Sequence, residues 1–225
     1  MEMRIKEIVE RCEGSILDIG CVQHTLERVK SDSWLHGALA ERFNEVMGID
    51  ILQEEIKKLQ KMGYNVRYGN AENFELNEKF NTIVAGELIE HLSNPGKFLD
   101  CCRKHLKDDE KLILTTPNPH WIEYTVRRLF KKLYVNPEHT ALYDEDLITH
   151  LAERHHFKVI EVKYIIERSK TSTLKGFIWH KIVFPILSRF LPEEFTANRL
   201  LFVIEEGFII KDGSSIAVGG IDKNV

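Results

Sequence analysis

The stretch SILDIGC, residues 15–21, decides the fold of this chain. Its first five residues form a short apolar run, interrupted only by Asp18, that ends at Gly20. Such a run is typical of a buried strand in a parallel sheet. A glycine directly after a strand lets the backbone approach a ligand where a Cβ atom would clash. We therefore expect a ligand-binding turn at Gly20.

Strand and helix patterns alternate on both sides of this turn. The predicted strands are 15–19, 45–49, 65–68, 81–85, 111–116, 158–166 and 200–210, and the predicted helices are 3–12, 24–43, 52–62, 95–106 and 144–156. This alternation predicts right-handed βαβ units and an α/β fold whose parallel sheet is covered on both faces. Residues 1–211 then form a single domain, with a helical insertion or lid at 168–199 and a flexible tail at 212–225.

Bulk composition excludes several classes of protein. The chain has 225 residues, a net charge of −4 and a pI near 6.2, so nucleic acid is not an expected partner. No apolar run is long enough to span a membrane, and the N-terminus lacks the apolar region of a signal peptide. The four cysteines form no C-x-x-C pair, which is typical of reduced thiols in a cytoplasmic protein.

Polar residues follow the second and third predicted strands, where ligands of such sheets bind. Asp50 can accept hydrogen bonds from a ribose diol, or it can cap the following helix. Asn70 can pair with an adenine edge while the Ala71 N–H contacts the ring, or it can form an ordinary Asx turn. The run after Gly20 is GCVQHT, so the dinucleotide fingerprint G-x-G-x-x-G is absent and a nicotinamide-dependent oxidoreductase is disfavoured.

Five segments resemble, in the same order, the class I S-adenosylmethionine (SAM)-dependent methyltransferases. They are ILDIGC (16–21), GID (48–50), GNAENF (69–74), FNTIVAGELIEHLSNPGKFL (80–99) and HLKDDEKLILTTPNPH (105–120). The resemblance implies a Rossmann-like, doubly wound seven-stranded sheet with strand order 3-2-1-4-5-7-6 and an antiparallel last strand. It also implies SAM as the cofactor.

The same resemblance implies a role for each matching residue. Asp18 and Gly20 would line the methionine end of SAM, Asp50 the ribose, Asn70, Ala71 and Glu72 the adenine, and Gly86 and Glu87 the transferred methyl group. The chain departs from the family at Val22, where a second glycine is usual, and at Asn70, where aspartate is frequent. The segment from Gly20 to Asp50 is also about ten residues longer than usual, and SDSWLHG (31–37) is the candidate insertion.

The segment ELIEH, residues 87–91, carries the candidate catalytic side chains. If a helix begins at Glu87, then Glu87, Glu90 and His91 share one face, and His139 can join them from a later loop. The four side chains can bind a divalent cation such as Mg²⁺ or Mn²⁺. Without a metal, His91 or His139 can act as a general base. The third interpretation is structural, with Glu87 contacting SAM. His24, His36 and His120 are further candidates, each more typical of a surface or supporting position.

The pattern E-x-x-E-H with a later histidine resembles metal-assisted O-methyltransferases, which include small-RNA 2′-O-methyltransferases and quinone-biosynthesis enzymes. We therefore expect O-methylation of a small-molecule, glycan or lipid-linked hydroxyl. An RNA 2′-O-methyltransferase and a non-catalytic SAM-binding module remain alternatives. The apolar segment 174–191 is expected either to contact a membrane or lipid-linked acceptor, or to pack as a lid or dimer interface. The sequence does not reveal the oligomeric state.

Overall fold

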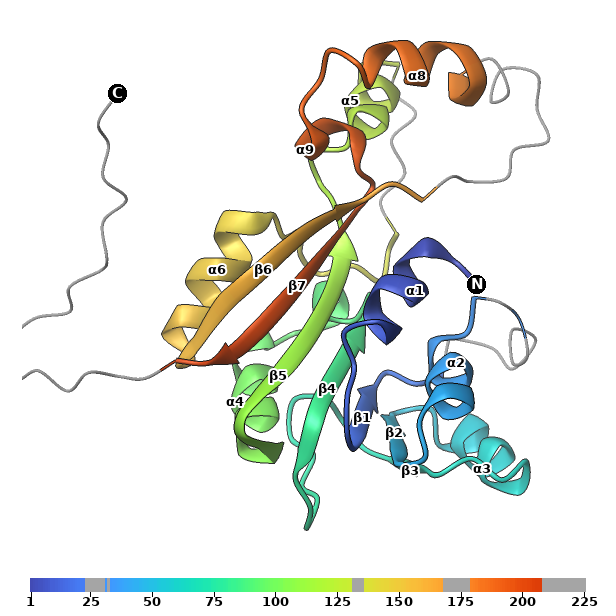
Figure 1. Cartoon of the computed structure of the whole chain (residues 1–225), viewed down its shortest axis with the longest axis vertical. Helices are drawn as coiled ribbons and strands as arrows, with labels where there is room; N and C mark the ends of the chain where they lie inside the picture. The colour runs from blue at the N-terminus through green and yellow to red at the C-terminus, as the bar shows by residue number, and fades with distance from the viewer. Residues whose placement is uncertain (23–30, 32, 131–135, 168–178, 208–225) are drawn as a thin grey trace, which may run out of the picture.

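A single twisted sheet with helices on both faces organises the protein (Figure 1). The structure, a computed structural model, describes residues 1–22, 31, 33–130, 136–167 and 179–207. The strand order is β3-β2-β1-β4-β5-β7-β6. The strands are β1 (Ile16–Ile19), β2 (Val46–Asp50), β3 (Val66–Tyr68), β4 (Phe80–Gly86), β5 (Leu106–Pro117), β6 (Phe157–Ile165) and β7 (Arg199–Glu206). β7 runs antiparallel to both β5 and β6, and the other pairs are parallel. The predicted fold class and strand order are confirmed.

The helices follow the predicted alternation. They are α1 (Met3–Val9), α2 (Leu35–Arg42), α3 (Gln53–Lys61), α4 (Pro95–His105), α5 (Ile122–Leu129), α6 (Glu145–Arg154), α8 (Phe184–Leu187) and α9 (Glu193–Thr196). Asn94 and Asp144 cap α4 and α6, because their side chains accept the Lys97 and Leu147 N–H groups.

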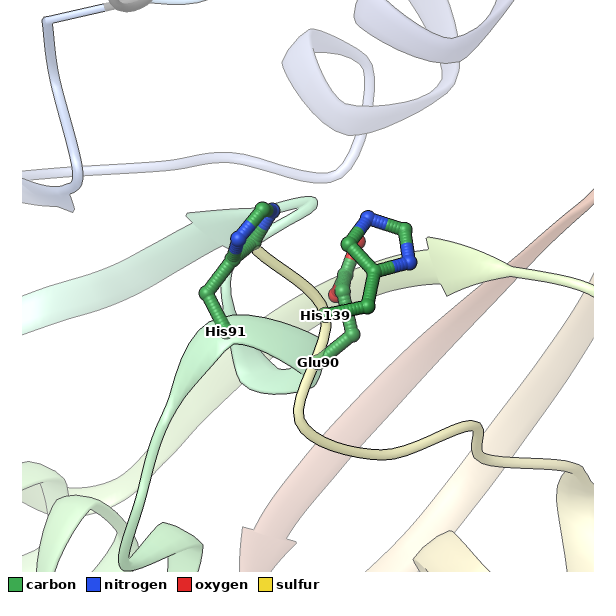
Figure 2. A group of neighbouring side chains, drawn as sticks. All are labelled: Glu90, His91 and His139. Atoms are coloured by element: carbon green, nitrogen blue, oxygen red, sulfur yellow. The ribbon is translucent and has the colours of Figure 1, made fainter. Parts of the chain in front are cut away.

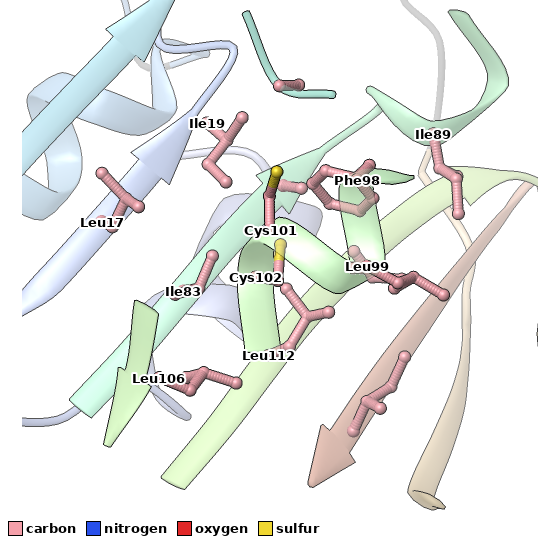
Figure 3. Packing of buried hydrophobic residues seen from close by; sticks show 14 of the residues in the cluster. Leu17, Ile19, Ile83, Ile89, Phe98, Leu99, Cys101, Cys102, Leu106 and Leu112 are labelled. Carbon is pink, nitrogen blue, oxygen red and sulfur yellow. The ribbon is translucent and has the colours of Figure 1, made fainter. Parts of the chain in front are cut away.

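Two apolar layers hold the helices to the sheet. On one face, α4 presents Phe98, Leu99 and Cys102 to the strands, and Figure 3 shows these side chains in one layer with residues of the sheet that include Ile83 and Leu112. On the other face, α1 and α2 contribute their own buried residues: Ile5, Ile8, Leu35 and Leu39. Burial on both faces explains why the central strands read as continuous apolar runs. The layers fix the carboxyl ends of β1, β2 and β4 at one edge of the sheet.

Several element boundaries differ from the predicted ones. β5 begins at Leu106 rather than at residue 111, so it includes a charged stretch that does not resemble a strand. Helix α5 lies between the predicted strand 111–116 and the predicted helix 144–156, where no helix was predicted. In the predicted helix 24–43, α2 begins at Leu35, and residues 23–30 and 32 lie outside the described part of the chain.

The insertion and the tail are only partly described. Within 168–199 the structure shows a π-helical turn η3 (Trp179–Val183), α8 and α9, while 168–178 lie outside the described residues. The predicted tail 212–225 also lies outside them. Among the described residues, no helix has the length and apolar character needed to cross a membrane. All four cysteines are free and buried.

Candidate active site

Gly20 and Asp50 determine the conformation of the turn after β1. Gly20 has a φ of 81°, a left-handed value that suits glycine, and a Cβ atom there would lie 3.2 Å from Leu88 Cδ1. The Asp50 carboxylate accepts the Val22 N–H (2.9 Å) and the Leu52 N–H (3.0 Å). Burial raises the pKa of Asp50. Asp50 therefore links the ends of β1 and β2, and its role in binding a ribose stays a prediction.

The loop after β3 has the conformation of an Asx turn. Asn70 Oδ1 accepts the Glu72 N–H (2.9 Å), while Ala71 is buried. Glu72 Oε1 accepts the Asn94 N–H (2.8 Å), which ties this loop to the start of α4. The Asx turn was the structural alternative for Asn70. The adenine role of Asn70, Ala71 and Glu72 stays a prediction.

Arg4 is a candidate that the sequence reasoning missed. It is buried, and a Cβ atom on Gly86 would lie 2.8 Å from Arg4 Nη1. The ion-pair partner given by the structure is Glu2, at 4.0 Å. Gly86 ends β4, so this guanidinium lies at the ligand-binding edge of the sheet. Arg4 comes from α1, ahead of the first motif, and the residues around it gave no signal for this position.

The predicted helix beginning at Glu87 is wrong. Glu87 has a φ of 54°, and the helical turn that follows is the three-residue 3-10 helix η2 (Ile89–His91). The Glu87 carboxylate turns toward Arg199 at the start of β7, with Oε2 2.7 Å from Arg199 Nε. The angle is that of an ion pair rather than a hydrogen bond, since Arg199 Nε has no hydrogen-bond partner. Glu87 Oε1 is buried and unpartnered.

The structure brings together three of the four predicted metal-binding side chains. Ligand atoms of Glu90, His91 and His139 all lie within 4.8 Å of one another, and Glu87 is not part of this group. Figure 2 shows the Glu90 carboxylate next to the His139 ring, with the His91 ring on the other side. The ring centroids of His91 and His139 are 4.7 Å apart. This ring contact connects η2, which follows β4 and carries His91, to the loop before α6, which carries His139.

Burial controls the ionisation of this cluster. It raises the pKa of Glu90 to about 8, with a further contribution from the nearby Glu87 carboxylate. Glu90 Oε2 accepts the Thr116 hydroxyl (3.1 Å), whereas Glu90 Oε1 is buried without a partner. Burial also lowers the pKa of His139, helped by His91 and Arg199. A neutral imidazole beside an unsatisfied carboxyl oxygen can bind a cation or accept a proton.

Thr140 fixes the loop that carries His139. Its N–H donates to the Glu90 carbonyl (2.8 Å), and its hydroxyl donates to the carbonyls of Glu90 (3.1 Å) and Leu92 (2.7 Å). These bonds hold His139 against η2. The other histidine candidates lie elsewhere: His120 pairs with Asp144 (3.3 Å), His36 with Asp18 (3.1 Å), and His24 falls outside the described residues.

Comparison with known proteins assigns this arrangement to a family. A family model described as "Methyltransferase domain" matches residues 2–162, which include every motif from α1 to β6. The chain belongs to the class I SAM-dependent methyltransferases. The predicted family, enzyme class and cofactor are thereby confirmed.

Curated methyltransferase relatives match about half of the chain. The ubiquinone biosynthesis O-methyltransferase of Rattus norvegicus is 29% identical over 128 residues, which are 52% of this chain and 34% of that protein. The counterpart from Actinobacillus pleuropneumoniae is 27% identical over 132 residues and is covered over 53% of its length. The chain thus spans between a third and about half of the length of these relatives.

Solved methyltransferase structures share the fold over nearly the whole described chain. A SAM-dependent methyltransferase from Archaeoglobus fulgidus superimposes with a TM-score of 0.62 at 17% identity, covering 90% of this chain and 91% of the other. At this identity the likeness concerns the fold alone.

The residues at the sheet edge fit the methyltransferase cofactor. Gly20 and Gly86 leave space that a Cβ atom would fill, and the Arg4 guanidinium lies at the end of β4. Asp18 is buried on β1. A guanidinium suits a carboxylate and a carboxylate suits an ammonium group, so this edge offers groups of both charges to the amino-acid end of SAM.

Proposed function

We propose that this chain transfers the methyl group of SAM to a hydroxyl oxygen. The observation that carries the proposal is the cluster of Glu90, His91 and His139, which lies just beyond Gly86 at the end of β4. Methyl transfer needs an aligned nucleophile and exclusion of water, and a hydroxyl must also lose its proton. The O-methyltransferase names of the curated relatives support oxygen as the acceptor atom.

SAM carries its methyl group on a sulfonium sulfur, and the thioether that remains after transfer is a good leaving group. The protein therefore mainly has to bind and orient the two substrates and remove a proton from the acceptor. Arg4 and Asp18 would hold the amino-acid end of SAM, and Asp50 would accept hydrogen bonds from its ribose. In the metal-free cluster His139 is the residue we assign as proton acceptor, because its lowered pKa keeps its ring neutral near neutral pH. With a cation bound, the acceptor nitrogen of His139 would be a metal ligand and could not take the proton.

A divalent cation fits the same cluster. One carboxylate and two imidazoles make a nitrogen-rich ligand set, which favours Mn²⁺ over Mg²⁺. The unpartnered Glu90 Oε1 is the atom of this chain that a cation would satisfy. If bound there, a cation held by Glu90, His91 and His139 would act as a Lewis acid that makes an acceptor hydroxyl easier to deprotonate near neutral pH.

For the acceptor we propose an apolar or lipid-linked molecule reached at a membrane surface. Leu129 and Phe130 at the end of α5 and Phe190 after α8 are 76%, 71% and 82% exposed. Basic residues lie near them in the sequence: Arg127, Arg128, Lys181 and Arg189. Exposed apolar side chains flanked by cations are typical of surfaces that bind anionic membranes.

The test is methyl transfer from labelled SAM to three acceptors: a catechol with an isoprenoid chain, the same catechol without it, and an RNA oligonucleotide with a free 2′-hydroxyl. We expect methylation of the isoprenoid catechol on oxygen. His139→Gln should lower the rate by about a hundredfold or more. The matched control is His150→Gln on the exposed face of α6.

Each outcome selects one function. Preferential methylation of the RNA would replace our proposal with the 2′-O-methyltransferase alternative. If SAM binds but none of the hydroxyls is methylated, the non-catalytic binding module becomes the better description. A full rate in His139→Gln would remove His139 from the catalytic role.

A further inference from the structure

Residues 33–37, in the candidate insertion between β1 and β2, pack against the turn that follows β1. Trp34 and His36 are almost completely buried, although they lie in the candidate insertion 31–37. A Cβ atom on Gly37 would lie 2.4 Å from Trp34 Cε3, so glycine is what allows the indole to pack against the start of α2. A segment with such tight packing is a structural part of the turn.

Two hydrogen bonds connect this segment to the turn. The Trp34 indole N–H donates to the Cys21 carbonyl (2.9 Å). His36 Nδ1 lies 3.1 Å from Asp18 Oδ2, and both side chains are 1–2% exposed. A carboxylate oxygen accepts hydrogen bonds, so the tautomer with the proton on His36 Nδ1 is the one that satisfies this contact.

The surrounding residues leave the His36 ring little freedom. A Cβ atom on Gly48 would lie 2.8 Å from His36 Cε1 and 2.7 Å from Cys21 Sγ, so only glycine fits on β2 at this point. The Tyr64 ring contacts the rings of both Trp34 and His36, with centroids 4.9 and 5.9 Å away. Both the orientation of the imidazole and that of the carboxylate bonded to it are thereby determined.

From these contacts we infer that His36 is a positioning residue, which acts through Asp18 on the ammonium group at the amino-acid end of SAM. The inference rests on the proposed binding of SAM at this edge. Val22 stands where the family usually has a second glycine. In this chain Trp34 and His36 contact the turn through Cys21 and Asp18. Removal of His36 leaves Asp18 buried without this partner and free to turn away from the cofactor.

The experiment compares two ligands by isothermal titration. S-adenosylhomocysteine (SAH) carries the amino-acid end, whereas 5′-methylthioadenosine lacks it. We expect His36→Leu to weaken SAH binding about tenfold, as expected for a charge-assisted hydrogen bond, and to leave methylthioadenosine binding unchanged. His36→Asn should restore most of the SAH affinity, because its amide N–H can take the place of Nδ1–H. A purely structural role would weaken both ligands alike.

Asp18→Asn provides the matched control. It should show the same loss for SAH alone, and His36→Leu should add little in the Asp18→Asn background. Equal losses for both ligands, or additive losses in the double variant, would overturn the inference. If His36→Leu fails to fold, the Asn variants at 36 and 18 still test it, since an SAH affinity in His36→Asn as low as in Asp18→Asn contradicts it. Failure of the wild-type protein to bind SAH would instead overturn the proposed function.

Discussion

At the scale of single residues, the candidate site concentrates ionisable side chains. Glu87, Glu90 and Arg199 lie close together, and Glu87 adopts a left-handed φ of 54° that is uncommon for a residue with a side chain. Backbone strain of this kind costs about 1–3 kcal/mol and persists where the surroundings enforce it. Here the ion pair with Arg199 and the N–H bond from Glu87 to the Thr115 carbonyl (2.9 Å) enforce it.

Glu90 gives a prediction about stability and pH. Its pKa of about 8 lies above the ordinary 4.5, so the folded protein keeps a proton that the unfolded chain releases. Without a metal, the free energy of unfolding should therefore fall as pH rises from about 5 to about 8. Glu90→Gln should reduce this fall, and its Tm should exceed that of the wild type at the upper pH.

Thermal unfolding in EDTA at several pH values measures the Tm difference between the wild type and Glu90→Gln. For a chain of this size, a change of 1 kcal/mol in the free energy of unfolding shifts the Tm by roughly 2–4 °C. Added Mn²⁺ should raise the Tm of the wild type near pH 8 and leave Glu90→Gln unchanged. An identical Mn²⁺ shift in both proteins would contradict a metal site at Glu90.

Asp50 gives a second prediction at this scale. Asp50→Ala should weaken SAH binding by about 1–3 kcal/mol, because it leaves buried ribose hydroxyls and the Val22 N–H without an acceptor. Isothermal titration with SAH measures the change. Glu55→Ala, on the neighbouring helix α3, serves as the control. An unchanged affinity would remove Asp50 from the cofactor site.

At the scale of elements, the sequence predicted what depends on local pattern. The run from Ile16 to Ile19 is apolar because β1 is buried on both faces, so the strand and the glycine after it could be recognised. The start of β5 could not be recognised, since Lys107 to Glu110 are charged and exposed or partly exposed. Pairing with β4 is interrupted between Leu106 and Lys111, and Asp109 has a left-handed φ of 60°, so this stretch is an irregular part of the strand without a strand-like sequence pattern.

The site was predictable only in part for a related reason. Glu90, His91 and His139 were identified from their spacing and chemistry, whereas the direction of Glu87 depends on Arg199, which follows 112 residues later. Arg4 and Thr140 owe their positions to tertiary contacts that no local pattern encodes.

The loop before α6 gives a prediction at this scale. Thr140→Val removes two hydroxyl hydrogen bonds to the carbonyls of Glu90 and Leu92. We expect a loss of stability of about 1 kcal/mol and a fall in methyl-transfer rate of about ten- to a hundredfold, because His139 is no longer held in place. Thr149→Val is the matched control, since that hydroxyl bonds only within α6, to the Glu145 carbonyl. Equal rates in the two variants would show that the loop does not position His139.

At the scale of the whole molecule, the three most exposed of the large apolar side chains that the structure describes belong to the α5 and α8 segments: Leu129, Phe130 and Phe190. Figure 1 places α5, α8 and α9 beyond the carboxyl end of β5, away from the amino end of the sheet. The described side chains there include Phe130 and Phe190, both largely exposed. The overall charge of −4 contrasts with the basic residues near these positions. These side chains are the basis of our proposal that this end of the molecule approaches an anionic membrane surface.

Vesicle binding tests that orientation. The wild type should sediment with vesicles of phosphatidylglycerol and phosphatidylcholine, and less so as salt increases. Phe130→Ser with Phe190→Ser should weaken partitioning by about tenfold or more, because each buried phenyl ring contributes about 1.5–3 kcal/mol. Met62→Ser, at the end of α3, is an exposed apolar control. Equal partitioning of all three proteins would contradict the proposed membrane surface.

The measurement that tests the central claim most directly is isothermal titration of the wild-type protein with SAH, in EDTA and again with Mn²⁺. The account predicts micromolar binding in both conditions, abolished or strongly weakened in Asp50→Ala. It also predicts a separate Mn²⁺ binding event that requires Glu90, His91 and His139. If SAH bound neither in EDTA nor with Mn²⁺, the assignment of the β1, β2 and β4 edge as the cofactor site would be contradicted. The proposed methyl transfer would then be contradicted as well.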